Sequence, residues 1–164
     1  MGKLELVIES DNVSIYSPKY DGETQTEFEK FMSDNGELEN PQLKKDFDAI
    51  IAAIKKIIDD CGARENLFRP EGNNIKAIPL CIEQRRGKGV GTLRLYCIRI
   101  SGKILIIGNG GIKRVKRYED DPILLDIVNK LRFIEHQIFI GTRKIHADYD
   151  DYQKVKMIIE AITI

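Results

Sequence analysis

The chain has 164 residues, with 26 basic and 26 acidic side chains, so that its formal net charge is zero. This length fits one domain, the 42% of hydrophobic residues can form a buried core, and the 32% of charged residues argues against wholesale disorder. No apolar run approaches the roughly 20 residues that a bilayer span requires, and the early acidic residues are untypical of a signal peptide. We therefore expect a cytoplasmic protein without a membrane partner.

The amino-terminal half of the chain predicts one or two strands followed by two helices. Residues 3–9 alternate in part between polar and apolar side chains, as a strand does, and residues 13–16 follow a turn as the returning strand. Residues 23–34 predict a short helix with an acidic start. Residues 41–60 predict a long helix, because apolar side chains recur there at helical spacing behind a proline at its first position.

The middle of the chain predicts a small antiparallel sheet. Residues 75–82 read as a strand that Pro79 interrupts, which favours an edge or a bulge. Residues 92–100 and 103–109 are two further strands, and the short Ser-Gly turn between them predicts a tight central hairpin.

Two helices are expected after the sheet. The acidic pair before Pro122 opens the first, Gly141 is expected to break the chain, and a last helix covers residues 148–162. The order of elements predicts an α+β fold in one domain over residues 1–164, with residues 142–164 as a candidate C-terminal helical appendage.

Positive charge is concentrated in one window of the sequence. Between Glu83 and Glu119 there is no acidic residue but ten basic ones, which leaves the remaining segments with 16 basic and 26 acidic side chains. Such segregation produces a local positive field that suits a phosphate-rich partner. A solvated basic surface balanced by acidic helices is the simpler alternative. The ten residues are Arg85, Arg86, Lys88, Arg94, Arg99, Lys103, Lys113, Arg114, Lys116 and Arg117.

Three segments of this window could contact phosphates. The strand TLRLYCIRI places Arg94 and Tyr96 on one face and Arg99 on the other, and an arginine beside a tyrosine hydroxyl suits phosphate binding. Residues 108–118 read as a glycine-rich turn feeding a basic run, and residues 85–89 as a basic glycine loop. Because all three leave adjacent ends of one small sheet, we expect them to converge on one surface. Each also has a structural alternative, namely a salt-bridged arginine or a solvated loop.

Metal and cofactor sites are not expected. Cys61, Cys81 and Cys97 lack the CxxC spacing and read as reduced thiols, and His136 and His146 are isolated from each other in the sequence.

The run GTLRLYCIRISGKILIIGNGGIKR, residues 91–114, resembles the core of RelE/HigB-type toxins of bacterial type II toxin–antitoxin modules. The segment IKRVKRYEDDPILLDIV resembles the helix entry of the HigB branch, and the order of the upstream elements also fits. The resemblance implies a RelE-like domain and an mRNA endoribonuclease, often ribosome-dependent, that a cognate antitoxin neutralises. It implies metal-free cleavage, in which the RNA 2′-hydroxyl attacks its own phosphate.

The resemblance also implies roles for individual residues. Arg94 matches the strand arginine of the family as a phosphate clamp, Lys113 and Arg114 match the basic residues after the last strand, and Tyr118 or Tyr96 would supply a hydroxyl. A lysine base would need a lowered pKa, which neighbouring cations favour. The candidate catalytic residues are Arg94, Lys113, Arg114 and Tyr118. The candidate RNA-binding residues are Arg85, Arg86, Lys88, Tyr96, Arg99, Lys116 and Arg117.

Two alternatives stay open. The first is a non-catalytic module of the same fold that holds RNA or a protein through the basic face. The second is a basic face that only receives an acidic helix of a partner protein. The chain is neutral and longer than small members of the toxin family, and it carries additional elements at both ends.

Overall fold

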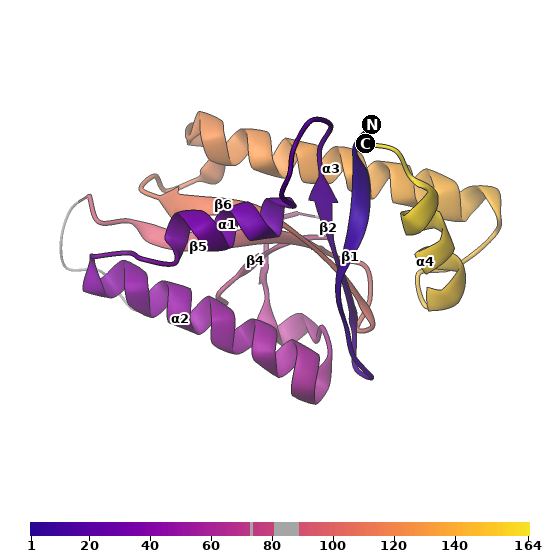
Figure 1. Ribbon diagram of the computed structural model, residues 1–164, viewed down its shortest axis with the longest axis horizontal. Helices are drawn as coiled ribbons and strands as arrows, with labels where there is room; N and C mark the ends of the chain where they lie inside the picture. The colour runs from indigo at the N-terminus through magenta and orange to yellow at the C-terminus, as the bar shows by residue number, and fades with distance from the viewer. Residues whose placement is uncertain (73, 81–88) are drawn as a thin grey trace.

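The computed structural model describes residues 1–72, 74–80 and 89–164. Within them, six strands form one sheet in the order β1-β2-β6-β5-β4-β3 (Figure 1). All neighbouring strands are antiparallel except β2 and β6, which run parallel. The strands are β1 Lys3–Glu9, β2 Ser14–Lys19, β3 Arg69–Pro70, β4 Ile75–Ile78, β5 Thr92–Arg99 and β6 Ile104–Lys113.

Helices cover both faces of this sheet. The helices are α1 Glu27–Asn35, α2 Pro41–Lys56, which continues into a π-helical turn Ile57–Cys61, α3 Pro122–Lys144 and α4 Tyr152–Ala161. Figure 1 shows α1 and α2 on one side of β5 and β6 and α3 on the other. Short 3₁₀ turns at Glu65–Leu67 and Tyr118–Asp120 precede β3 and α3.

The sheet divides the hydrophobic core into two layers. Along β5, Leu93, Leu95 and Cys97 pack with α1 and α2, whereas Tyr96 and Ile98 pack with α3 and α4. All five side chains are at most 1% exposed. A strand that is apolar on both faces is typical of the centre of a three-layer sandwich, where each face is covered by helices.

The predicted α+β order of elements is confirmed, and local sequence signals explain the helix starts. Thr26 and Glu29 form a capping box at α1, and the side chains of Asn40 and Asp121 accept backbone N–H groups at the starts of α2 and α3. The predicted hairpin is the antiparallel pair β5–β6. The two N-terminal strands belong to the same sheet, because β2 joins β6 in parallel.

The sequence predicts a glycine-rich turn at residues 108–111, but the structure shows that these residues belong to strand β6. A side chain at Gly108 would lie 2.9 Å from Leu131 of α3, and one at Gly110 would collide with the carbonyl oxygen of Arg94. The glycines therefore allow α3 and β5 to approach β6 closely, next to a β-bulge in the β5–β6 pair. The expectation of a phosphate-binding loop at this place is wrong.

Gly141 does not break the chain either, because α3 continues through it to Lys144. A Cβ atom at this position would lie 2.7 Å from Ile158 of α4, so the glycine provides room for the contact between the two helices. Val155 and Ile159 of α4 are fully buried in the core layer of α3.

The two ends of the described chain lie side by side (Figure 1), where the Ile164 N–H donates to the Gly2 carbonyl at 3.0 Å. Strand β4 ends before Pro79, and positions 81 and 82 of the predicted strand lie outside the described residues. None of the helices in the described part of the chain combines the length and apolar character of a membrane span.

Candidate functional site

Arg94 lies on the α3 face of β5 and is only 4% exposed. Its Nη1 donates to the carbonyl oxygen of Pro79 at 3.0 Å, and its buried Nε has no hydrogen-bond partner among the described residues. Burial lowers the pKa of Arg94, and the neighbouring Arg69 lowers it further. A buried guanidinium with an unused donor is costly on its own, so its surroundings decide what it can do.

Those surroundings combine cations with one half-buried carboxylate. Lys113 ends β6 opposite Thr92, and Glu71 directly follows the edge strand β3. The side chain of Glu71 is 12% exposed, and one carboxylate oxygen lies 3.7 Å from Nε of Arg69. The backbone N–H of Glu71 donates to the Ile75 carbonyl at 2.9 Å, which fixes its position beside β4. We call Arg69, Glu71, Arg94 and Lys113 the charged cluster.

The pKa values in the charged cluster move toward each other. Burial raises the pKa of the Glu71 carboxyl, while Lys113, Arg69 and Arg94 oppose this rise. Burial lowers the pKa of Lys113, Arg94 and Arg69 add to this effect, and Glu71 opposes it. Perturbed acids and bases that lie together and away from water are typical of sites that transfer protons.

A pair of tyrosines borders the cluster. Tyr96 and Tyr118 meet edge to face, with ring centroids 6.1 Å apart, and both are buried. Nη2 of Arg132, on α3, donates to the Tyr118 hydroxyl oxygen at 2.6 Å. Burial raises the pKa of both phenols, and Arg132 works against this rise at Tyr118. Glu71 acts electrostatically on both tyrosines, so the pair lies near the charged cluster.

Three predicted basic residues lie exposed beyond Lys113. Nε of Arg114 donates to the Gly89 carbonyl at 2.9 Å, and Nε of Arg117 lies 3.5 Å from the Glu119 carboxylate. Lys116 is exposed to solvent. This segment therefore offers accessible positive charge next to the charged cluster.

Arg99 does not join these residues. Its Nε donates to the Ala63 carbonyl at 2.6 Å and its Nη1 lies 3.6 Å from Glu65. Five residues of extended strand separate Arg99 from Arg94 by about 17 Å. Because side chains alternate between the two faces of a strand, Arg99 lies on the opposite face of the sheet from Arg94. The expected convergence of the basic segments does not include Arg99. Arg85, Arg86 and Lys88 lie outside the described residues.

Sequence reasoning missed three members of the site, namely Arg69, Glu71 and Arg132. All three lie outside the acid-free window, and only the pairing of β3 with β4 and the packing of α3 bring them to it. The one local signal is Pro70, which marks a short edge strand directly before Glu71.

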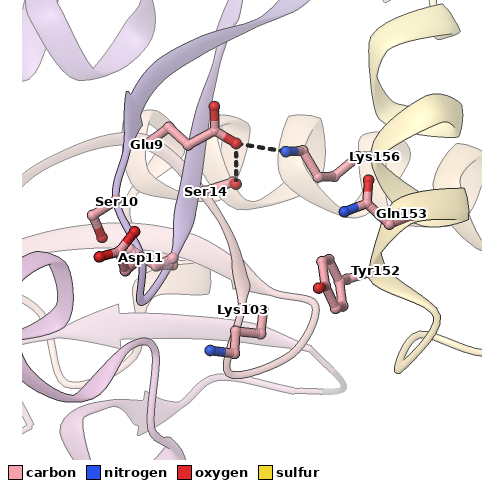
Figure 2. A pocket seen from close by; sticks show the side chains of 9 residues that line it. Glu9, Ser10, Asp11, Ser14, Lys103, Tyr152, Gln153 and Lys156 are labelled. Atoms are coloured by element: carbon pink, nitrogen blue, oxygen red, sulfur yellow. Dashed lines mark hydrogen bonds and ion pairs between the residues drawn. The ribbon is translucent and has the colours of Figure 1, made fainter.

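A hollow of about 210 Å³ lies at the opposite end of the β5–β6 hairpin, between the β1–β2 turn and α4 (Figure 2). The carboxylate of Glu9 accepts hydrogen bonds there from Lys156 at 2.6 Å and from Ser14 at 3.1 Å. These contacts lower the pKa of Glu9, with Lys156 as the main cause. The carboxylate of Glu9 is thus held by two short hydrogen bonds, whereas the one ion pair that Glu71 makes with a described residue, to Arg69, is longer at 3.7 Å.

Within the described residues, no group of three or more histidine, cysteine, aspartate and glutamate side chains is placed to hold a metal ion. Cys97 is buried, Cys61 is partly buried, and both are free thiols. No protein-family model, curated protein or solved structure matches the chain. The resemblance to RelE/HigB toxins therefore stays a prediction from the motif.

Proposed function

We propose that the chain is a toxin-like endoribonuclease that cleaves mRNA, free or on the ribosome, at the charged cluster, and that a cognate antitoxin neutralises it. The observation that carries the proposal is that the Glu71 carboxylate lies 3.7 Å from Arg69 and interacts electrostatically with Arg94, Lys113 and Tyr118. RNA transesterification needs a base, cations and a proton donor, and these residues are of the required types.

The chemistry assigns a role to each group. The Glu71 carboxylate accepts the proton of the RNA 2′-hydroxyl, whose oxygen attacks the adjacent phosphorus. Arg94 and Lys113 stabilise the charge on the phosphate oxygens, and the bond from phosphorus to the 5′ oxygen breaks. Tyr118 gives its proton to the leaving 5′ oxygen, and the products are a 2′,3′-cyclic phosphate and a 5′-hydroxyl. Arg114, Lys116 and Arg117 hold the backbone of the strand.

The structure favours Glu71 over Lys113 as the base. Burial raises the pKa of Glu71 and so makes its carboxylate a stronger base than an ordinary one, whereas a lysine must lose a proton that nearby Glu71 helps to retain. Lys113 then keeps its positive charge and stabilises the negative charge on the phosphate oxygens.

A second candidate function is a non-catalytic module that binds RNA or a protein. The burial of Arg94 and Tyr96 favours it, because side chains that are 4% and 1% exposed offer little surface to the reacting atoms of a substrate. This module would bind RNA in a salt-sensitive manner and leave it intact.

The deciding experiment incubates the purified protein with end-labelled RNA in the presence of a chelator. The endoribonuclease yields fragments with 2′,3′-cyclic phosphate ends, and Glu71→Gln and Lys113→Ala reduce their formation. Lys103→Ala is the matched control. Lys103 is an exposed lysine of the same basic window, but it lies in the turn between β5 and β6, at the end of the hairpin that is far from the charged cluster. Intact RNA at saturating protein, free or on ribosomes, together with undisturbed growth of a host expressing the chain, would exclude the nuclease and leave the binding module.

A further inference from the structure

Arg132 makes two contacts with Tyr118 at once. Its Nη2 donates to the hydroxyl oxygen at 2.6 Å, and its guanidinium carbon lies 5.9 Å from the centroid of the same ring. Arg132 comes from the middle of α3, whereas Tyr118 precedes that helix in a 3₁₀ turn. The contact therefore ties the turn to the helix at the border of the charged cluster.

The direction of this hydrogen bond determines what the Tyr118 hydroxyl can do. A phenol oxygen has one proton to donate and lone pairs that accept. Because Arg132 occupies the acceptor side and an arginine cannot accept, the proton of Tyr118 points away from Arg132, toward an acceptor such as the Glu119 carboxylate, whose pKa a hydrogen bond from Tyr118 lowers. A hydroxyl with this arrangement is prepared to donate a proton.

The ring of Tyr118 is held as firmly as its oxygen. It is 4% exposed and meets Tyr96 edge to face at 6.1 Å, with an angle of 64° between the planes. Leu124 of α3 belongs to the same core layer. Packing fixes the ring and Arg132 fixes the hydroxyl, so the donor needs little rearrangement when it reacts.

Tyr118 and Tyr96 differ in this respect. Tyr96 lies deeper, at 1% exposure, and it has no hydrogen bond to a cation of the described residues. When a phenol gives up its proton, the remaining phenolate needs a positive neighbour: Arg94 acts on Tyr96 only through space, whereas Arg132 donates a hydrogen bond directly to the Tyr118 oxygen. The geometry thus chooses between the two tyrosines that the sequence left open.

We propose that Arg132 is a positioning residue that orients Tyr118 as the proton donor to the leaving 5′ oxygen and stabilises the phenolate formed by that transfer. This inference rests on the proposed endoribonuclease function. In the step itself, the bond between phosphorus and the 5′ oxygen breaks, that oxygen takes the phenolic proton, and the Tyr118 phenolate regains a proton from water. Arg132 itself gives up no proton.

The first test needs no RNA. Ultraviolet difference titration, with Tyr118→Phe to identify the Tyr118 signal, is carried out on the wild type and on Arg132→Gln. Loss of the neighbouring cation raises the Tyr118 titration midpoint by about one pH unit or more. Arg143→Gln is the matched control, because Arg143 is an exposed arginine of α3 over the ring of Phe139 at 5.6 Å. An unchanged Tyr118 midpoint in Arg132→Gln would overturn the coupling, whatever the chain does to RNA.

The second test uses an RNA whose scissile 5′ oxygen is replaced by sulfur, a leaving group that needs no proton donor. On ordinary RNA, Tyr118→Phe slows cleavage about 100-fold or more and Arg132→Gln about tenfold to 100-fold. On the sulfur-containing RNA both variants approach the wild-type rate, whereas Lys113→Ala stays slow. If Arg132→Gln slows the cleavage of both RNAs by the same factor, the role of Arg132 is structural and the proposal fails. If the wild type cleaves neither RNA, the endoribonuclease itself is refuted.

Discussion

Replacement of Glu71 by glutamine tests the proposed function, because it should separate RNA binding from RNA cleavage. The side chain keeps its size and its place beside Arg69, but it loses the negative charge and the ability to take a proton. The charged cluster contains three cations and one carboxylate, so the change raises its net charge by one. We expect Glu71→Gln to bind RNA more tightly and to cleave it more slowly, two effects of opposite sign.

The magnitudes follow from the surroundings of Glu71. A general base contributes roughly 100-fold to 10,000-fold to such a reaction, and this factor is lost. A unit charge a few Å from a phosphate is worth about 1 kcal/mol in a water-like medium, which corresponds to about fivefold tighter binding. Removal of a merely structural carboxylate would weaken binding and cleavage together.

The pH profile gives an independent readout of the same substitution. Because burial raises the pKa of Glu71 above its usual 4.5, the wild type loses its base, and hence its activity, as the pH falls through that raised value. Lys113 has a lowered pKa, so the alkaline side of the profile falls off below its usual 10.5. Glu71→Gln should abolish the acidic limb and retain the alkaline one.

Single-turnover cleavage over a pH series, together with fluorescence anisotropy of labelled RNA, measures both effects. A Glu71→Gln variant that cleaves at the wild-type rate with an unchanged acidic limb would refute the assignment of Glu71 as base. If Glu71→Gln lost RNA affinity and also unfolded less cooperatively, Glu71 would have a structural role and its assignment as the general base would be refuted.

Three further variants test other parts of the structure. Lys113→Ala should flatten the dependence of log affinity on log salt by about 0.7 if Lys113 contacts one phosphate of a single strand, whereas Lys103→Ala should leave the slope unchanged; equal slopes for both would remove Lys113 from the interface. Gly110→Ala should destabilise the fold by about 1–3 kcal/mol in urea unfolding, because its Cβ meets a carbonyl oxygen of β5, while Gly102→Ala stays within about 0.5 kcal/mol; a neutral Gly110→Ala would contradict the close pairing at the bulge. Ile134→Ala, at a fully buried position of α3, should cost about 2–5 kcal/mol in the same assay, and a cost below about 1 kcal/mol would mean that α3 does not pack as described.

The order of elements was predictable because its signals are local. Asn40 and Pro41 start α2 through a side-chain cap and a fixed φ angle, and Asp121 with Pro122 starts α3 in the same way. The β5–β6 hairpin follows from two apolar runs around a short turn. None of these inferences needs knowledge of what packs against the segment.

The glycines were misread because their reason is not local. Gly108 and Gly141 look like chain breakers in the sequence, yet each lies inside a regular element and makes room for a side chain of another one. Leu131 and Ile158 are the side chains concerned, and no spacing rule connects them to those glycines. A glycine that allows close packing and a glycine that ends an element are identical until the neighbour is known.

The acid-free window has a different meaning in the sequence and in space. Along the chain it suggests a purely basic patch, which would hold phosphate but could accept a proton only at a lysine with a lowered pKa. In the fold, the segment after β3 brings Glu71 within the electrostatic reach of Arg94 and Lys113, and α3 places Arg132 against Tyr118. The proposed proton acceptor and the residue proposed to orient the proton donor thus both come from outside the window. The proposed catalysis therefore depends on the surroundings of Glu71 and on the contact between Arg132 and Tyr118 more than on the ten basic residues.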